Sequence, residues 1–334
     1  MRLGLLITSR CNARCAHCAT SCGPDRHESL PQDRLLALME EAAGQQEPGD
    51  GGLEFCLSGG EPFLDFPRLR DAVAHGTRLG ARVTCVTNGS WAASDEKARG
   101  TLDTLVEAGL AGLGVSTSRF HQRFVKRERV ERVLRLARER GLYAVLKCAV
   151  TRSDETELGA WARAAGADRL ELFPVVPYLR EGEAWAEEEF LRTPGVPAGT
   201  CPAPLLTLRE DGTVYSCCTP GAFSPFLALG NVFEESLGEI HRLSQASGRQ
   251  RILREHGPIH FVRAIEARGE AHRLRNGYAG VCDLCSHIAS DPVLAAIAGE
   301  AADQFEVTHL QALLAQLRGE RRSRRRRRTG IKHR

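Results

Sequence analysis

The first 22 residues contain four cysteines: Cys11, Cys15, Cys18 and Cys22. The first three have the spacing Cys-x3-Cys-x2-Cys, and thiolates this close together on one loop can bind a single soft-metal centre. Structural zinc takes four ligands, and electron-transfer iron–sulfur clusters usually have four cysteines, so three ligands leave one metal position open for chemistry. We interpret Cys22 as a loop or core thiol, with a role as fourth ligand as the open alternative.

A second set of cysteines lies in the second half of the chain. The stretch "LLTLREDGTVYSCC" predicts a hairpin with its turn at Asp211-Gly212. This hairpin brings two of the cysteines together, and a Cys-x2-Cys pair supplies two more. Zinc and iron–sulfur both fit such a closed four-thiolate site. The four predicted ligands are Cys201, Cys217, Cys282 and Cys285.

Cys218 directly follows the predicted ligand Cys217. Neighbouring residues of a strand point to opposite faces, so a Cys217 that faces the metal directs Cys218 the other way, into an active cavity. A buried core thiol without a role is the open alternative, because cysteine is among the most buried residue types. By the same tendency we expect Cys56, Cys85 and Cys148, which lie in predicted strands, to be core residues.

Alternating strands and helices must position the first cysteine loop. Short β-rich runs are followed by amphipathic stretches, and several of these stretches end at a glycine, as helices often do. This alternation predicts parallel βα units, which bind ligands at the carboxyl ends of their strands, where the cysteine loop also lies. The predicted strands are Leu3–Thr8, Leu53–Leu57, Arg82–Thr87, Gly112–Ser116, Tyr143–Val150 and Arg169–Phe173. The predicted helices are Gln32–Ala43, Pro67–Leu79, Asp95–Ala108, Arg127–Arg140 and Asp154–Ala165.

The chain has 334 residues, and its composition divides it into four parts. Residues 1–180 form the α/β domain, 181–200 are a Pro-, Gly- and Glu-rich linker, and 201–318 form a smaller cysteine-bearing domain. Residues 319–334 are a basic tail that we expect to be disordered by self-repulsion. The net charge is +3, but residues 321–334 contain nine Lys or Arg and no acid, which leaves the remaining chain at −6.

The location expected from the sequence is cytoplasmic. No apolar run is long enough to span a membrane, and the opening "MRLGLLI" is too short for a signal-peptide core. In a reducing compartment, twelve cysteines serve metal or redox chemistry rather than disulfides.

These motifs together resemble the radical S-adenosylmethionine (SAM) superfamily. "CNARCAHC" resembles its cysteine motif, "SGGEP" after the second strand resembles its GGEP motif, and "VTNGS" and "GVSTS" resemble later SAM-contacting strands. The resemblance implies a partial (β/α)6 TIM-like barrel and a [4Fe–4S] cluster on Cys11, Cys15 and Cys18. Ser118 departs from the family, where an Asp is frequent. The residues that the resemblance implies for SAM are Gly59, Gly60, Glu61, Pro62, Asn88, Ser116 and Lys147.

The second cysteine set resembles the twitch domain, the shorter relative of the SPASM domain. The shared order is Cys, Gly-x4-Cys and Cys-x2-Cys, with "LGNVFEESLGEI" in between. This resemblance implies an auxiliary [4Fe–4S] cluster in place of zinc. The two resemblances imply reductive cleavage of SAM to a 5′-deoxyadenosyl radical inside the barrel.

Among radical SAM enzymes, "SRCNARC" and "YSCC" are similar to the peptide epimerases. This likeness implies conversion of L- to D-residues in a ribosomally made precursor peptide, with removal of the Cα hydrogen and Cys218 as hydrogen donor. The partners would be that peptide and a one-electron reductant such as flavodoxin or ferredoxin. Because the first predicted strand begins at Leu3, we expect the barrel mouth, the smaller domain or the tail to recognise the peptide.

Two other readings stay open. The first is SAM-dependent oxidation, either of an alcohol or in thioether or carbon–carbon crosslinking of a peptide, with the auxiliary cluster as electron acceptor. The second is a nucleic-acid-binding protein with zinc sites and the arginine tail as its contact. The second is disfavoured because the basic charge is confined to the tail rather than spread over a folded face. A radical SAM enzyme that acts on tRNA is a smaller possibility.

Overall fold

The computed structural model describes residues 1–46, 51–154, 156–177, 180, 185–201, 205–219 and 223–329, with the side chains of 317–329 excluded. Six parallel strands alternate with helices in the first half, as the sequence predicts. The strands are β1 (Arg2–Leu6), β2 (Glu54–Ser58), β3 (Arg82–Thr87), β4 (Gly112–Thr117), β5 (Tyr143–Val150) and β6 (Arg169–Pro174). The helices are α1 (Gln32–Gly44), α2 (Phe66–Arg78), α3 (Asp95–Glu107), α4 (Arg127–Glu139) and α5 (Glu157–Ala164), with the 3-10 helix η1 (Pro62–Asp65) before α2.

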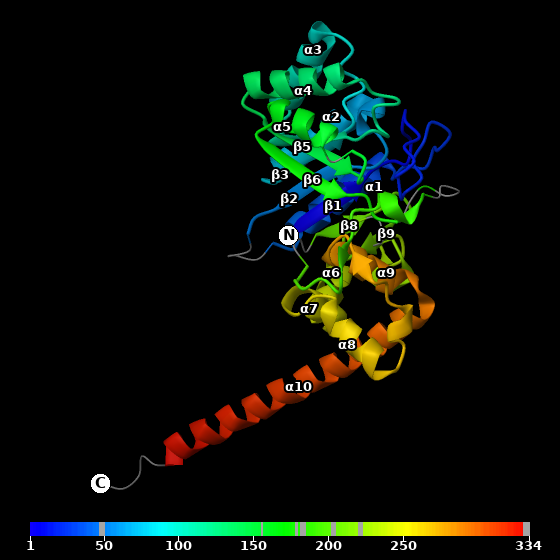
Figure 1. Ribbon diagram of the computed structural model, residues 1–334. Helices are drawn as coiled ribbons and strands as arrows, with labels where there is room; N and C mark the ends of the chain where they lie inside the picture. Colours follow the sequence, from blue (N-terminus) through cyan, green and yellow to red (C-terminus); the bar gives the residue numbers. More distant parts are fainter. Residues whose placement is uncertain are drawn as a thin grey trace.

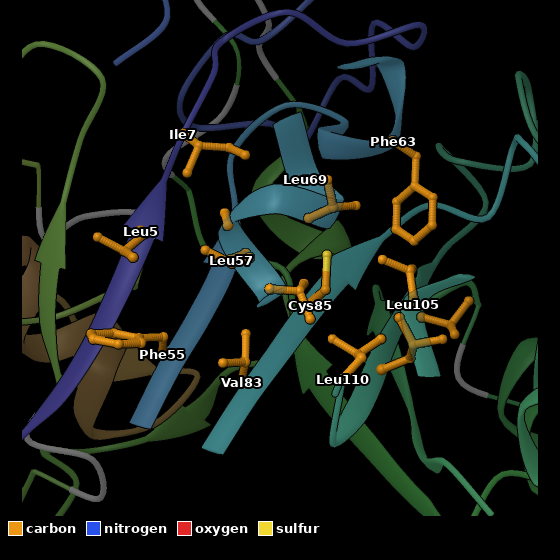
Figure 2. Close-up of a cluster of buried hydrophobic side chains, with 14 of the residues drawn as sticks. Leu5, Ile7, Phe55, Leu57, Phe63, Leu69, Val83, Cys85, Leu105 and Leu110 are labelled. Atoms are coloured by element: carbon orange, nitrogen blue, oxygen red, sulfur yellow. The ribbon is translucent and has the colours of Figure 1, made fainter. Parts of the chain in front are cut away.

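The main core fills the space between the sheet and these helices. Alternate residues of β1 and β2, such as Leu5 and Leu57, are fully buried and point toward the helices (Figure 2). Burial of such a side chain contributes about 1.5–3 kcal/mol. Cys85 points into the same cluster and Cys148 is also fully buried, so both predicted core thiols are confirmed. The opposite face of the sheet lines the cavity that contains the candidate functional site.

The second-half hairpin joins the barrel sheet, which the sequence did not predict. Strand β8 (Leu206–Leu208) pairs in parallel with β1, in a register that places Leu3 beside Leu206. Strands β9 (Thr213–Tyr215) and β10 (Ala228–Asn231) follow antiparallel, which gives a nine-stranded sheet of order β10-β9-β8-β1-β2-β3-β4-β5-β6. Gly212 has a φ of +83° at the predicted turn. The hairpin therefore forms a wall of the cavity that the barrel encloses.

Helices form the rest of the second half. Four of them, α7 (Gly248–Glu255), α8 (Ile259–Ala267), α9 (Val281–Ser290) and α10 (Pro292–Thr329), pack around their own apolar core, below the barrel in Figure 1. The preceding helix α6 (Leu237–Ala246) buries Leu237 and Ile240 in the main core instead. Short elements lie between the larger ones: η2 (Glu187–Glu189) and β7 (Thr193–Pro194) between β6 and β8, η4 (Pro225–Leu227) between β9 and β10, and η5 (Ala271–Arg273) and β11 (Gly277–Tyr278) between α8 and α9.

The end of the chain differs from its prediction. Helix α10 continues to Thr329, past residue 319, where the sequence analysis placed a disordered tail; residues 330–334 lie outside the described residues. Arginine is among the better helix formers, which favours this continuation over the expected self-repulsion. The outer part of α10 stands away from the rest of the molecule (Figure 1). Among the described residues, no single helix has the length and apolarity to cross a membrane; only α9 taken together with Pro292–Gln316, bent by 104°, passes that test.

Candidate functional site

The four N-terminal cysteines lie together in one cavity, where the chain leaves the carboxyl end of β1. This cavity has a volume of about 460 Å³, and Cys11, Cys15, Cys18 and Cys22 all line it. Backbone hydrogen bonds fold the loop back on itself: the Cys11 N–H donates to Gly23 O at 3.0 Å, and the Cys18 N–H donates to Cys15 O at 3.0 Å. The structure thus brings together the three predicted ligands, and Cys22 with them.

The thiols influence one another strongly. Burial, together with the neighbouring thiols, raises the pKa of Cys11 to about 11 and that of Cys15 to about 12. Cys18 differs because a hydrogen bond from the Cys22 side chain is the largest cause that lowers its pKa, to about 5. The same bond, with burial, raises the pKa of Cys22. A thiolate on Cys18 is therefore favoured within the group.

Two histidines that the sequence analysis did not assign to the metal site lie beside Cys15. Ligand atoms of Cys15, His17 and His121 lie within 4.8 Å of one another. Burial lowers the pKa of His17 to about 4 and that of His121 well below its usual value, so both imidazoles are neutral and able to coordinate or to stack. Ser118 holds His121 through a 2.8 Å contact between Oγ and Nδ1. The signal in the sequence was "STSRFH", a serine three residues before a histidine directly after β4.

Part of the segment predicted as a linker packs over the cysteine loop. Trp185 stacks on Phe120 with ring centroids 4.5 Å apart, and Phe190 stacks on Trp185 at 5.9 Å. Arg180, just before the segment, donates to the carbonyls of Cys15 and Ser21 at 3.2 Å each, and also to that of Cys22. Residues 181–184 lie outside the described residues. Phe190 and Trp185 belong to the same apolar cluster as Cys11, Cys15 and Cys22, so the start of 185–200 packs against the cysteine loop, and Arg180 binds that loop from just before the segment.

Gly59 and Gly60 bring the loop after β2 directly against the cysteine loop. The Gly60 N–H donates to Thr8 O at 2.6 Å, and the Glu61 N–H donates to Arg10 O at 2.9 Å. A Cβ on Gly60 would lie 2.1 Å from Arg10 O, and Gly59 has a φ of +140°, so both positions require glycine. Both glycines line the cysteine cavity.

The carboxylate of Glu61 is turned away from that cavity. It is fully buried and accepts from the Asn88 N–H at 2.7 Å, Thr87 Oγ1 at 2.8 Å and the Phe63 N–H at 3.2 Å. Burial raises its pKa to about 7 against these three bonds. Glu61 and Pro62 face a different hollow, on the outer side of the loop. The carboxylate of Glu61 therefore links the loop after β2 to the loop after β3.

The remaining predicted SAM contacts come from neighbouring strands. Asn88 is buried, and its Nδ2 donates to Asn12 Oδ1 at 3.0 Å and to Cys11 Sγ at 3.8 Å. Ser116 and Lys147 line the cavity side by side, because β4 and β5 pair them in register. Lys147 is not free: its Nζ bonds Glu171 Oε2 at 2.5 Å.

Cys218 lines the same cavity as the N-terminal cysteines, as the sequence predicts, although Cys217 and Cys218 lie beyond the end of β9 rather than in a strand. Ser58 and Lys147 line this cavity as well. Cys218 is exposed to this cavity, and the hydrogen bond of its thiol to Cys217 is the main cause that raises its pKa, so its sulfur keeps its hydrogen. Cys56 also lines this cavity and is only half-buried, so its prediction as a core residue is wrong: β2 turns it toward the interior of the barrel.

The second cysteine set also comes together. Cys201, Cys217, Cys282 and Cys285 line one small cavity of about 40 Å³ with apolar neighbours such as Leu253. Cys282 and Cys285 lie on adjacent turns at the start of α9, and Cys217 follows β9. Burial raises the pKa of Cys282 to about 11, while the hydrogen bond from Cys218 is the main cause that lowers the pKa of Cys217 to about 6.

Both donor sets fit iron–sulfur clusters by their chemistry. Four thiols that gather in a closed apolar cavity suit a [4Fe–4S] cluster or zinc, whereas Cys11, Cys15 and Cys18 open into a cavity with space for a further ligand. The carbonyls of Gly59 and Gly60 accept no hydrogen bond from the described part of the chain, so they are available to a ligand in that cavity.

Residues 5–155 match the model of the radical SAM superfamily. The chain is 22% identical over 293 residues to the putative peptide biosynthesis protein YydG of Bacillus subtilis (strain 168), an alignment that covers 84% of this chain and 90% of that protein. It is 30% identical over 93 residues to the S-adenosylmethionine-dependent nucleotide dehydratase of Psychrobacter lutiphocae, covering 25% and 31% of the two chains.

Solved structures share the fold. Native anSMEcpe with bound AdoMet matches with a TM-score of 0.52 at 17% identity, over 71% of this chain and 80% of that chain. Native anSMEcpe with bound AdoMet and the Kp18Cys peptide matches with a TM-score of 0.53 at 14% identity, over 71% and 79%. These likenesses agree with the parallel sheet of the first half, which contains most of the residues that match the radical SAM model.

Proposed function

We propose that this chain, whose residues 5–155 form a radical SAM domain, modifies a ribosomally made peptide by changing L-residues to D-residues. The observation that carries the proposal is the position of Cys218, which lines the same cavity as Cys11, Cys15 and Cys18. Inversion at Cα requires two groups on opposite sides of the substrate. A radical source removes the Cα hydrogen from one face, and a thiol returns a hydrogen to the other face. The similarity to YydG, a putative peptide biosynthesis protein, supports a peptide as substrate.

In this proposal Cys11, Cys15 and Cys18 hold a [4Fe–4S] cluster, and Cys201, Cys217, Cys282 and Cys285 hold an auxiliary one. Gly59, Gly60, Asn88, Ser116 and Lys147 surround SAM, and Glu61 and Pro62 support that wall from behind. The cluster and SAM, when bound, supply a 5′-deoxyadenosyl radical that removes one hydrogen atom from Cα of the substrate.

Residues of the chain then carry out the return of hydrogen to Cα. Cys218 keeps its hydrogen because its pKa is raised, and it delivers that hydrogen atom to the Cα radical from the other side of the cavity. The S–H bond of Cys218 breaks, the new C–H bond forms, and one electron with one proton afterwards restores the thiol. A one-electron carrier such as flavodoxin or ferredoxin supplies that electron. Trp185 and Phe190 cover the cysteine loop and limit water there.

Oxidation is the second candidate, and one observation favours it. Cys217 is adjacent to Cys218 in the chain, so an auxiliary cluster would lie next to the substrate cavity and could accept an electron from a substrate radical. Such an enzyme would remove two hydrogens from its substrate and would not need the Cys218 hydrogen.

Mass spectrometry separates these candidates. The assay is anaerobic and contains reconstituted enzyme, SAM, a reductant and the short peptide encoded beside the gene, in D2O and in H2O. We expect one deuterium to be incorporated in D2O and no mass change in H2O, because the thiol of Cys218 exchanges with solvent. Loss of two hydrogens in both solvents would establish oxidation instead.

Cys218→Ala is the decisive variant and Cys56→Ala its matched control, since both thiols line the same cavity. We expect Cys218→Ala to cleave SAM but to incorporate no deuterium, whereas Cys56→Ala keeps incorporation. Equal incorporation by the two variants would contradict the donor role of Cys218.

A further inference from the structure

A second hollow lies behind the glycine loop, on the outer side of the wall that faces the cysteine cavity. Its volume is about 140 Å³. Arg10, His27 and Arg68 bring three basic side chains to it from the loop after β1 and the start of α2. Glu61 and Asp65 are the acids of its wall. The hollow is thus a small, polar and mostly basic site beside the radical SAM centre.

The two arginines of this hollow have no ion-pair partner among the described residues. Arginines close to them in the sequence do have ion-pair partners: Arg14 pairs with Asp25 at 2.9 Å, and Arg70 pairs with Asp71 at 2.7 Å. Nε and Nη2 of Arg68 are buried without any hydrogen-bond partner, and burial lowers the pKa of Arg68.

Neither acid of the wall is within ion-pair distance of these arginines, although the charge of Asp65 counteracts part of the effect of burial on the pKa of Arg68. The carboxylate of Glu61 is directed at Asn88, Thr87 and Phe63, as described above. Asp65 caps α2, and its Oδ1 accepts from the backbone N–H of Arg68 at 3.4 Å. Arg68 is half-buried, but guanidinium nitrogens that are buried without a partner are unfavourable, and a carboxylate is the group that the planar fork binds best. The arginines of the hollow are therefore suited to bind an anion from outside the described chain.

The place of the hollow indicates the source of that anion. Arg10 directly precedes Cys11, and its carbonyl accepts from the Glu61 N–H, so one thickness of main chain separates the hollow from the cysteine cavity. The chain outside residues 321–334 carries a net charge of −6. On such a body a local basic site orients an acidic partner, because complementary charge steers encounter and selects the docking face.

We propose that this hollow is the docking site of an acidic one-electron carrier protein, which inserts a surface carboxylate between Arg10 and Arg68. The proposal rests on the proposed function only in that the centre on Cys11, Cys15 and Cys18 needs an electron. The carrier loses one electron and the centre gains it, and no bond forms or breaks. Docking here brings the carrier to the residue that directly precedes Cys11, because Arg10 lines the hollow.

The test measures SAM cleavage without any peptide, so it does not depend on what the enzyme modifies. The variant is Arg10→Gln with Arg68→Gln, and the matched control is Arg70→Gln, whose arginine lies on the same helix but is paired with Asp71. Electrons come either from reduced flavodoxin at low ionic strength or from dithionite. We expect the flavodoxin-driven rate to fall about tenfold or more in the double variant. The dithionite-driven rate should stay unchanged.

Two further measurements test whether the anion belongs to the carrier protein. The flavodoxin-driven rate of the unaltered protein should fall as salt is added, and that dependence should flatten in the double variant. Arg10→Lys with Arg68→Lys keeps both charges and should restore most of the rate. Equal iron content and melting temperature in all variants exclude a folding defect.

Two results would overturn the proposal. One is a double variant that accepts electrons from flavodoxin as fast as Arg70→Gln does. The other is a hollow that binds inorganic phosphate in calorimetry while the flavodoxin-driven rate is insensitive to both arginines, which would make it a small-anion site. A peptide that remains unmodified by an enzyme with normal flavodoxin-driven SAM cleavage would refute the proposed function and leave the docking site intact.

Discussion

Substitution of Gly60 by alanine tests how the two loops of the site are held together. The new Cβ would lie 2.1 Å from Arg10 O and 2.6 Å from Arg10 C. Carbon and oxygen normally approach to about 3.3 Å, so the loops must separate by about 1 Å. That shift breaks the hydrogen bonds from Gly60 N to Thr8 O and from Glu61 N to Arg10 O. At about 1 kcal/mol for each bond, we expect a loss of roughly 2–3 kcal/mol of unfolding free energy.

The assay is anaerobic denaturant unfolding together with iron content per chain after reconstitution. Gly44→Ala is the matched control, because Gly44 ends α1 with no atom within 4 Å of its added Cβ. Alanine in a helix is favoured over glycine by about 0.5–1 kcal/mol, so the control should be neutral or stabilising. We expect Gly60→Ala to bind less iron than Gly44→Ala. Equal stability and equal iron in the two variants would refute the reasoning.

Two further predictions concern the charged groups of the site. Since burial raises the pKa of Glu61 from 4.5 to about 7, the folded state holds more protons than the unfolded state between these values, and stability falls as pH rises through that window. At about 1.4 kcal/mol for each pKa unit, the loss is roughly 3 kcal/mol, and Glu61→Gln should remove this part of the pH dependence of unfolding. Arg180→Gln removes donors to the carbonyls of Cys15, Ser21 and Cys22, so it should lose iron several-fold faster to a chelator than the unaltered protein. A pH profile unchanged by Glu61→Gln, or chelation unchanged by Arg180→Gln, would contradict the respective prediction.

The local pattern of the chain was enough for the first half of the fold. β3 and β5 begin and end where the sequence predicted, and the other strands of the first half differ by one or two residues. Burial of every second residue in a strand and capping of helices by nearby residues are local effects, so they can be read from short windows. Cys217 and Cys218 line two different cavities, as the sequence predicts, but strand alternation is not the reason, because β9 ends at Tyr215 and their side chains share a hydrogen bond.

The site was predicted less completely, because side-chain direction depends on distant segments. Glu61 is predicted among the SAM contacts, but its carboxylate is turned inward to Thr87 at the end of β3 and to Asn88 just after it. His121 has no predicted role at the site, yet the turn after β4 brings it to Cys15. Cys56 is predicted as a core residue, although β2 presents it to the cavity.

The sequence by itself determined the alternating strands and helices, the two cysteine groups and the loop that carries the first of them. Only the tertiary structure decided that β8 pairs with β1, which makes Cys218 part of the same cavity as Cys11. The pairing joins residues about 200 positions apart, and its register depends on how two distant segments bury their side chains together. The hollow behind the glycine loop also depends on tertiary structure. That Arg68 lacks a hydrogen-bond partner can be recognised only when the positions of the nearby carboxylates are known.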